Sequence, residues 1–324
     1  MLLISFLLAE FSLALLFSVT RVHSFVLHPS STPRYVQVRA MTSTTTIGSA
    51  TGTTAVGEGA SPGLPNAERK SQLSVCNNEE GYNLNGVLTV KDEGSKSLWV
   101  LCHGLCSSCE GTVPRFVSDE LNANTFRFDF AGCGGSGGDW KYAGYDRELG
   151  DLRAVVLGLR ELGWSVDCVL GHSKGAAAVL RYGETFEDVP LIVNVAGRFD
   201  TSETPRSRFT EDQWDQLETT GSFQWSVKGE NLTINRSDFE ERAKLNMRNT
   251  AMAIKRSKVV TIHGTDDETI PVADAREFAK VLPNNELAII EGATHRFATE
   301  PEQREVMKVL SRYVEPVPPT STGA

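Results

Sequence analysis

The residues that point most directly to chemistry form the pentapeptide at 171–175, Gly-His-Ser-Lys-Gly. An apolar run at 168–170 favours a strand before it, and an alanine-rich stretch from 176 favours a helix after it. A sharp turn between a strand and a helix leaves a serine hydroxyl exposed at the helix N-terminus, and only glycine tolerates the crowding on either side. The pattern therefore predicts that Ser173 is a nucleophile.

A serine nucleophile needs a base to accept its proton. The sequence has six histidines, and five are set aside by their positions: His23, His28, His103, His172 and His263. The first two precede the predicted fold, two lie in His-Gly steps at the ends of strands, and the side chain of His172 is expected to point away from the serine beside it. His295, which follows the last predicted strand, is the base by elimination.

The base in turn needs an acidic partner that fixes its tautomer. Three carboxylates in a row, Asp266, Asp267 and Glu268, follow the seventh predicted strand. Adjacent side chains cannot all face one imidazole, and spacing alone does not choose among them. The remaining carboxylates are expected to form the solvated, acidic start of a helix.

The oxyanion produced by attack of the serine needs two backbone N–H donors. Lys174, the residue after the serine, is expected to supply one of them at the start of the helix. The other is expected from the loop after the third predicted strand, which reads His-Gly-Leu at 103–105. Within this loop we assign the donor to Leu105.

The elements that must position these residues alternate along the chain. Short β-rich runs predict strands at 73–76, 84–90, 97–102, 125–130, 167–170, 191–195, 258–262 and 286–290. Helical patterns fill the gaps from the third run onward, at 145–162, 273–282 and 301–313 among others. Strands that alternate with helices predict an α/β fold, a mostly parallel sheet covered on both faces, with the first two strands as an antiparallel ribbon at its edge.

One segment, 201–256, is too long for a simple helical connection between the sixth and seventh strands. It carries Phe209, Trp214, Phe223, Trp225 and Phe239, and a short hairpin is predicted around Lys-Gly-Glu at 228–230. Long insertions in compact domains are usually functional lids, so a lid is expected here. The alternative is that the aromatic rings only anchor the insertion to the core.

Five segments resemble, in order and spacing, the serine aminopeptidase-like and feruloyl-esterase-like branch of the α/β-hydrolase superfamily, and plant and algal α/β hydrolases in particular. They lie at 103–105, 128–136, 171–175, 263–271 and 292–297. The resemblance covers about 73–314. It implies an α/β-hydrolase fold over 71–314, with an eight-stranded sheet flanked by helices, the second strand antiparallel, and a lid insertion (201–256) after strand 6.

The same resemblance implies that the acid is Asp267, which stands four residues before Pro271. The order Ser, Asp, His is that of α/β-hydrolases. Two positions depart from the pattern of the relatives. Leu105 replaces the phenylalanine found in many of them, which affects only the shape of the acyl pocket, and Lys174 replaces the commoner glutamine or methionine, with an effect that the sequence leaves open.

The expected activity is that of a serine hydrolase that cleaves carboxylic esters through an acyl-enzyme. Thioesters and small amides are the next substrates, and neither a metal nor an organic cofactor is expected. An acyltransferase or a cofactor-free haloperoxidase on the same fold remains open, as does a non-catalytic ligand receptor built on a hydrolase scaffold. The expected partner is a small-molecule ester. The net charge of −9 is spread along the chain without a Lys/Arg cluster, so nucleic acid is not expected.

The spacing of Cys102, Cys106 and Cys109 is that of the iron–sulfur site of radical-SAM enzymes, a different enzyme class. Against this interpretation, Cys102 falls inside a buried strand pattern, and the same stretch supplies the expected oxyanion loop. We therefore expect free thiols, with a disulfide only in an oxidising compartment.

The N-terminal region reads as a targeting leader. Residues 1–24 are apolar and signal-like, and 25–70 is transit-like and then a disordered linker, because 25–57 lacks Asp and Glu and is rich in Ser and Thr. The polar, proline-rich tail at 315–324 is also expected to be disordered. A plastid location through a bipartite leader is expected, with no stable membrane span in the mature domain. The alternatives are the secretory route, a membrane-anchored form, or a cytosolic form begun at Met41.

We expect a fusion of residues 1–60 to a fluorescent protein to reach the plastid. Replacement of Phe25 by Ala at the predicted junction should divert the fusion to the secretory route. Fluorescence microscopy in an alga with secondary plastids measures both outcomes. A wild-type fusion found in the medium, vacuole or cytosol would show that the leader is not bipartite.

Overall fold

The computed structural model describes residues 39–41, 69–77, 80–202, 204 and 206–314. The predicted signal-like segment at 1–24, most of the segment at 25–70 and the tail at 315–324 lie outside these residues. Within the described part of the chain, no helix combines the length and the apolar character needed to cross a membrane.

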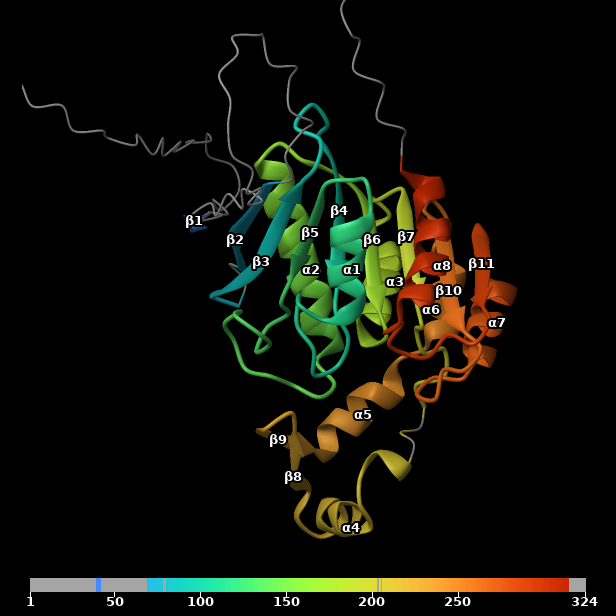
Figure 1. The fold of residues 1–324 in the computed structure, drawn as a ribbon. Helices are drawn as coiled ribbons and strands as arrows, with labels where there is room; N and C mark the ends of the chain where they lie inside the picture. The colour runs from blue at the N-terminus through green and yellow to red at the C-terminus, as the bar shows by residue number, and fades with distance from the viewer. Residues whose placement is uncertain (1–38, 42–68, 78–79, 203, 205, 315–324) are drawn as a thin grey trace, which may run out of the picture. The chain divides into compact units, whose positions relative to one another are not determined.

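The described residues form a central sheet of nine strands in the order β1-β2-β3-β5-β4-β6-β7-β10-β11 (Figure 1). From β5 to β11 neighbouring strands are parallel, whereas β3 is antiparallel to both β2 and β5. The bounds are β1 Arg39–Met41, β2 Arg69–Asn77, β3 Tyr82–Val90, β4 Ser97–Cys102, β5 Thr125–Phe128, β6 Ser165–His172, β7 Leu191–Val195, β10 Lys258–Gly264 and β11 Asn285–Ile290.

The expected number of eight strands is therefore corrected to nine. The additional strand, β1, lies inside the segment 25–70, which was expected to be transit-like and then a disordered linker. It pairs antiparallel with β2, with Arg39 opposite Ser74 and Met41 opposite Gln72. The outer edge of β2 would otherwise present unpaired backbone N–H and C=O groups, and a short strand can satisfy them whatever its side chains are.

Helices cover the sheet on both faces. In Figure 1, α1 (Thr112–Glu120) and α8 (Glu300–Leu310) lie in front of it. The opposite face carries α2 (Tyr145–Glu161), α3 (Lys174–Phe186), α6 (Met247–Ala253) and α7 (Val272–Val281). A short 3-10 turn, η2 (Ser311–Tyr313), follows α8.

The central strands are buried because both of their faces pack on helices. Along β4, Val100 and Cys102 belong to the core cluster on the α2–α3 side, whereas Trp99 and Leu101 belong to the cluster on the α1–α8 side. The apolar stripe predicted for 145–162 is the face of α2 that enters the first of these clusters. A sheet covered in this way leaves the loops at its edges as the places for chemistry.

The insertion between β7 and β10 has its own elements. They are η1 (Arg206–Arg208), α4 (Glu211–Thr220), β8 (Ser222–Val227), β9 (Glu230–Asn235) and α5 (Arg236–Lys244), followed by α6. The predicted hairpin is present as β8–β9. Its turn residues Lys228 and Gly229 have φ values of 52° and 83°, as a tight two-residue hairpin turn requires.

The aromatic rings of the insertion form a small cluster of their own. Phe209 and Phe223 are buried against Tyr142, which precedes α2, and Trp225 packs at the edge of the same cluster. In Figure 1, α4, α5 and the hairpin lie beyond one end of the strands, outside the two helical layers. These rings therefore anchor the insertion to the main fold.

Candidate active site

Ser173 lies at a strained turn between β6 and α3. Its φ is 57°, a value that non-glycine residues rarely adopt. A Cβ on Gly171 would lie 2.1 Å from the carbonyl oxygen of Gly175, and one on Gly175 would lie 2.5 Å from the carbonyl oxygen of His103. Side chains at either glycine would push the backbone apart, so the two glycines are what allows the turn to form.

Three of the predicted site residues meet at this turn through hydrogen bonds. Nε2 of His295 lies 3.0 Å from the hydroxyl oxygen of Ser173, and Nδ1 of His295 lies 2.7 Å from Oδ2 of Asp267. The other carboxylate oxygen of Asp267 accepts hydrogen bonds from the N–H groups of Thr269 and Ile270, at 2.8 and 2.7 Å. The serine, the imidazole and the carboxylate thus form one continuous chain of hydrogen bonds.

The carboxylate of Asp267 is fully buried and remains ionised. Burial by itself would raise its pKa, but hydrogen bonds from His263 and His295 and the backbone N–H of Ile270 outweigh burial and hold the pKa well below its usual range. An ionised carboxylate at Nδ1 leaves Nε2 of His295 free to act on the serine hydroxyl.

The two neighbouring carboxylates are placed differently. Asp266 is exposed, and Oδ1 of its carboxylate accepts a hydrogen bond from the Thr265 hydroxyl at 3.0 Å. Glu268 accepts the backbone N–H of His295, at 3.4 Å. Of the three carboxylates, Asp267, which the family resemblance implied, is the one in contact with the imidazole.

Two further histidines support this chain, and sequence reasoning had set both aside. Nε2 of His263 donates to the carbonyl of Ile270 at 2.9 Å and lies 3.2 Å from Oδ2 of Asp267. The side chain of His172 was expected to point away from Ser173. Instead, its Nε2–H donates to the carbonyl oxygen of His295 at 2.8 Å, because the end of β6 lies beside the loop that follows β11. In the sequence, the one sign of a role for His263 was its place in a His-Gly step at the end of a predicted strand, now β10.

The two expected oxyanion donors, Lys174 and Leu105, line the same cavity as Ser173. Lys174 is the first residue of α3, where backbone N–H groups have no partner within the helix. A Cβ on Gly104 would lie 3.1 Å from Cβ of Ser173, so the backbone of the loop at 103–105 runs directly against the serine. Leu105 follows in this loop and lines the same cavity as Ser173.

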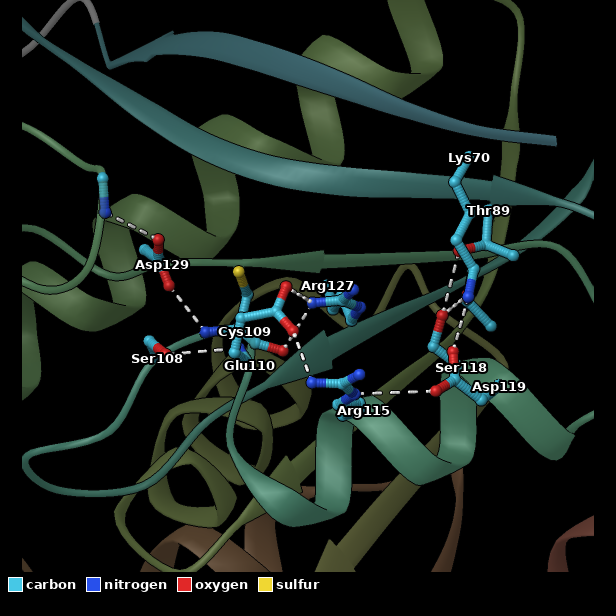
Figure 2. Close-up of polar contacts among 12 residues, drawn as sticks. Lys70, Thr89, Ser108, Cys109, Glu110, Arg115, Ser118, Asp119, Arg127 and Asp129 are labelled. Atoms are coloured by element: carbon cyan, nitrogen blue, oxygen red, sulfur yellow. Dashed lines mark hydrogen bonds and ion pairs between the residues drawn. The ribbon is translucent and has the colours of Figure 1, made fainter. Parts of the chain in front are cut away.

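Buried polar contacts hold the loop after β4 in place. Nε2 of His103 accepts the N–H of Phe130 at 3.1 Å, so Nδ1 carries the proton and donates to the carbonyl of Gly104 at 2.8 Å. Figure 2 shows the far end of the loop, where the carboxylate of Asp129 accepts the N–H of Cys109 at 2.6 Å. There Arg127 also donates to the Cys109 carbonyl, at 2.9 Å. The loop is therefore fixed at both ends.

The side chain of Lys174 has a structural contact that the sequence did not reveal. Its Nζ lies 2.5 Å from Oε1 of Glu148 on α2 and 4.9 Å from the ring centre of Tyr145. Burial would lower the pKa of Lys174, but the carboxylate of Glu148 raises it above its usual value, so the ammonium group stays charged. This ion pair joins the first turn of α3 to α2.

A cavity of about 740 Å³ opens in front of Ser173 and His295. Its walls combine the loop after β4, the segment before α2 and the insertion, through residues that include Leu105, Trp140, Tyr142, Trp225 and Leu232. Trp214 packs in the aromatic cluster and donates its ring N–H to the carbonyl of Arg206 at 2.9 Å. The insertion thus both anchors to the fold and forms part of the cavity wall.

The three cysteines of the alternative iron–sulfur motif lie in different surroundings. Cys102 is buried in the core on the α2–α3 side, whereas Cys106 lines the cavity and Cys109 is bound into the loop that Asp129 holds. Burial raises the pKa of Cys106 to about 11, which keeps it a thiol. Among the residues that the structure describes, no three His, Cys, Asp or Glu side chains are grouped so that they could hold a metal ion.

The buried histidines make folding stability depend on pH. Burial lowers the pKa of His172 to about 3 and that of His103 to about 4, from an ordinary value of 6.5. At pH values between the folded and unfolded pKa, the unfolded chain binds more protons than the folded chain. The contribution of these two histidines to the free energy of unfolding therefore falls as the pH is lowered from about 6.5 towards 4.

We expect His172→Gln to reduce this pH dependence, because its amide can keep the hydrogen bond to His295 without taking up a proton. The slope of the free energy of unfolding between about pH 4.5 and 6 should fall by about 1.4 kcal/mol per pH unit, the contribution of one proton. Urea unfolding of both proteins at several pH values measures the difference. Identical slopes would mean that His172 is protonated to the same extent in the folded and unfolded chains.

Three solved structures have a similar fold. A hydrolase from Agrobacterium vitis S4 is 18% identical, with 76% of this chain and 99% of that chain covered and a TM-score of 0.60. Est1E from Butyrivibrio proteoclasticus, solved with ferulic acid bound, is 18% identical, with 72% and 95% covered and a TM-score of 0.59. An esterase from Pyrococcus furiosus is 21% identical, with 79% and 96% covered and a TM-score of 0.59.

No curated protein matches the sequence. The sequence at 99–307 matches the family model described as the alpha/beta hydrolase family. The match spans more than half of the chain, and it includes Ser173, Asp267 and His295. The chain belongs to the alpha/beta hydrolase family.

Proposed function

We propose that this protein is a serine hydrolase that cleaves carboxylic esters through an acyl-enzyme intermediate, with Ser173 as nucleophile, His295 as base and Asp267 as the orienting acid. The observation that carries the proposal is the hydrogen-bond chain from the Ser173 hydroxyl through both nitrogens of His295 to the buried carboxylate. A nucleophile, a base within hydrogen-bond reach and a third group behind the base are what acyl transfer requires.

The reaction follows from these positions. As Oγ of Ser173 attacks the ester carbonyl carbon, Nε2 of His295 takes the serine proton. Asp267 stabilises the imidazolium that forms. His295 then gives this proton to the leaving alcohol as the C–O bond breaks, and an acyl-serine remains. Water then attacks the acyl carbon while Nε2 of His295 takes its proton. His295 returns this proton to Oγ of Ser173 as the acyl–oxygen bond breaks, and the carboxylic acid is released.

The oxyanion of each tetrahedral intermediate is stabilised by the backbone N–H groups of Lys174 and Leu105. The proposal is supported by the start of α3 at Lys174 and by the close approach of the Gly104 backbone to Ser173. Donors fixed before the reaction stabilise developing charge without having to reorganise. The polar contacts that hold the loop after β4 would keep the N–H of Leu105 in place before the reaction begins.

The family resemblance further supports a place in the serine aminopeptidase-like and feruloyl-esterase-like branch, with the insertion as a lid over the substrate. Thioesters and small amides are the next substrate classes after esters. An acyltransferase would hand the acyl group to an alcohol in place of water. A receptor would react once with an activated ester and release product barely or not at all.

We expect Ser173→Ala to fold normally and to lower the hydrolysis of 4-nitrophenyl acetate by roughly three to six orders of magnitude. The reason is that no other side chain at the turn can form the acyl-enzyme. Steady-state release of 4-nitrophenol by the purified full chain measures the loss, with the unfolding midpoint as a control for folding. Substantial turnover in this variant would exclude Ser173 as the nucleophile.

Asp267→Asn should lower kcat on the order of 10⁴-fold, because an amide at this position favours the wrong tautomer of His295. Asp266→Asn is the matched control, since its carboxylate is exposed and bonds to the Thr265 hydroxyl. It should change kcat little. Comparing the two variants on the same ester tests the choice of acid, and a reversal of their effects would assign the role to Asp266.

A further inference from the structure

Positively charged side chains gather around the cavity that holds Ser173. Its lining includes six basic residues, Lys174, Arg198, Lys228, Arg208, Arg242 and Arg296, and two acidic ones, Glu110 and Glu230. Two of the basic groups are already engaged. Lys174 pairs with Glu148, and Nζ of Lys228 donates to the carbonyl of Cys106 at 2.7 Å.

Three further cations, Arg198, Arg208 and Arg242, come from separate elements and all line the cavity. Arg198 follows β7, Arg208 ends η1, and Arg242 lies in the last turn of α5. Burial lowers the pKa of Arg198, and the charges of Arg242 and Arg208 lower it further, so each of the two lies close enough to Arg198 to repel it. Two of the three belong to the insertion.

Two carboxylates, Asp200 and Asp274, lie near enough to Arg198 to interact with its charge. Among the described residues, no carboxylate forms an ion pair with Arg198 or Arg208. Arg198 instead donates to the carbonyl of Thr269 at 2.6 Å. The charge of Asp274 raises the pKa of Arg198, but the Asp274 carboxylate accepts the backbone N–H of Phe199.

Neither of the two acids that line the cavity forms an ion pair with Arg198 or Arg208. Glu110 is engaged by Arg127 and Arg115, and Glu230 is exposed at the hairpin turn. Arg242 donates to the hydroxyl of Tyr145, the first residue of α2, at 3.0 Å, and this is not its only interaction. Like charges in a partly desolvated wall cost folding free energy, so their convergence calls for a role.

We propose that Arg198, Arg208 and Arg242 form a subsite for a carboxylate on the ester substrate, so that the enzyme prefers anionic esters over their neutral isosteres. The inference rests on the proposed function, because it places the anion in the cavity of Ser173. A guanidinium presents a planar fork of donors that matches a carboxylate, and a partly buried wall strengthens the attraction. The insertion thereby contributes to substrate selection as well as covering the site.

The test compares pairs of esters in which a free carboxylate is replaced by its methyl ester, with each rate divided by that of uncatalysed hydrolysis of the same ester. For the acyl side, mono-4-nitrophenyl adipate is paired with its methyl ester; for the alcohol side, 4-acetoxybenzoate is paired with methyl 4-acetoxybenzoate. We expect kcat/KM of the purified full chain to be at least tenfold higher for the anionic member of one pair. This preference should shrink as the salt concentration rises, since added ions screen the charges.

Variants assign the preference to the subsite. Arg208→Gln should reduce the ratio of anionic to neutral kcat/KM by about tenfold, and Arg208→Lys should restore part of it. Arg248→Gln is the matched control, because Arg248 is an exposed cation of the insertion that does not line the cavity, and it should keep the wild-type ratio. Arg198→Gln provides a second reading of the subsite should Arg208→Gln fail to fold.

The outcomes separate the two proposals. Hydrolysis of the neutral esters that depends on Ser173, without preference for the anion in either pair, would overturn the subsite and leave the serine hydrolase standing. An anion preference that Arg208→Gln and Arg198→Gln both leave intact would also overturn it. Hydrolysis of none of the four esters, together with no labelling of Ser173 by a fluorophosphonate, would overturn the proposed function and the subsite with it.

Discussion

The close approach of α3 to the ends of β6 and β4 is the constraint on which the rest of the site depends. It exists because residues 171 and 175 are glycines, since a Cβ at either would lie 2.1 or 2.5 Å from a backbone oxygen. The approach holds Ser173 at a positive φ and points its hydroxyl at His295. It also brings the Gly104 backbone against the serine, so one packing contact positions the proposed nucleophile and the loop that carries a proposed oxyanion donor.

The charges of the site are stabilised by hydrogen bonds around Asp267 and around the loop that carries His295. Asp267 is buried, and four hydrogen-bond donors around it compensate for the lost solvent: His263, His295, and the N–H groups of Thr269 and Ile270. His172 holds the backbone of the loop that carries His295. The proposed base is thereby fixed both through its ring and through its main chain, which is how a rigid scaffold supports a reactive side chain.

The sequence was informative where chemistry and local pattern coincide. The strand–turn–helix signal located Ser173, elimination located His295, and the strands at 97–102 and 191–195 have the predicted bounds. Spacing could not choose Asp267 from its neighbours, because that choice depends on how a loop turns in three dimensions. The family resemblance supplied it.

Other features depend on tertiary contacts that no local pattern encodes. The pairing of Lys174 with Glu148 joins residues on two helices. Arg198, Arg208 and Arg242 line one cavity only in the folded chain, because two of them belong to the insertion and one does not. The prediction that the His172 side chain points away from the site was wrong for the same reason, because its contact with His295 is tertiary. β1 was missed because an edge strand is selected by the backbone groups it satisfies and carries little sequence signal.

The most direct test of the central claim is to map the residue that a small fluorophosphonate modifies in the purified full chain. Mass spectrometry of the digested adduct should place the phosphonyl group on Ser173, and His295→Ala should abolish the modification because no base remains to take the serine proton. Modification at another residue, or labelling of the His295→Ala variant at the wild-type rate, would contradict the account.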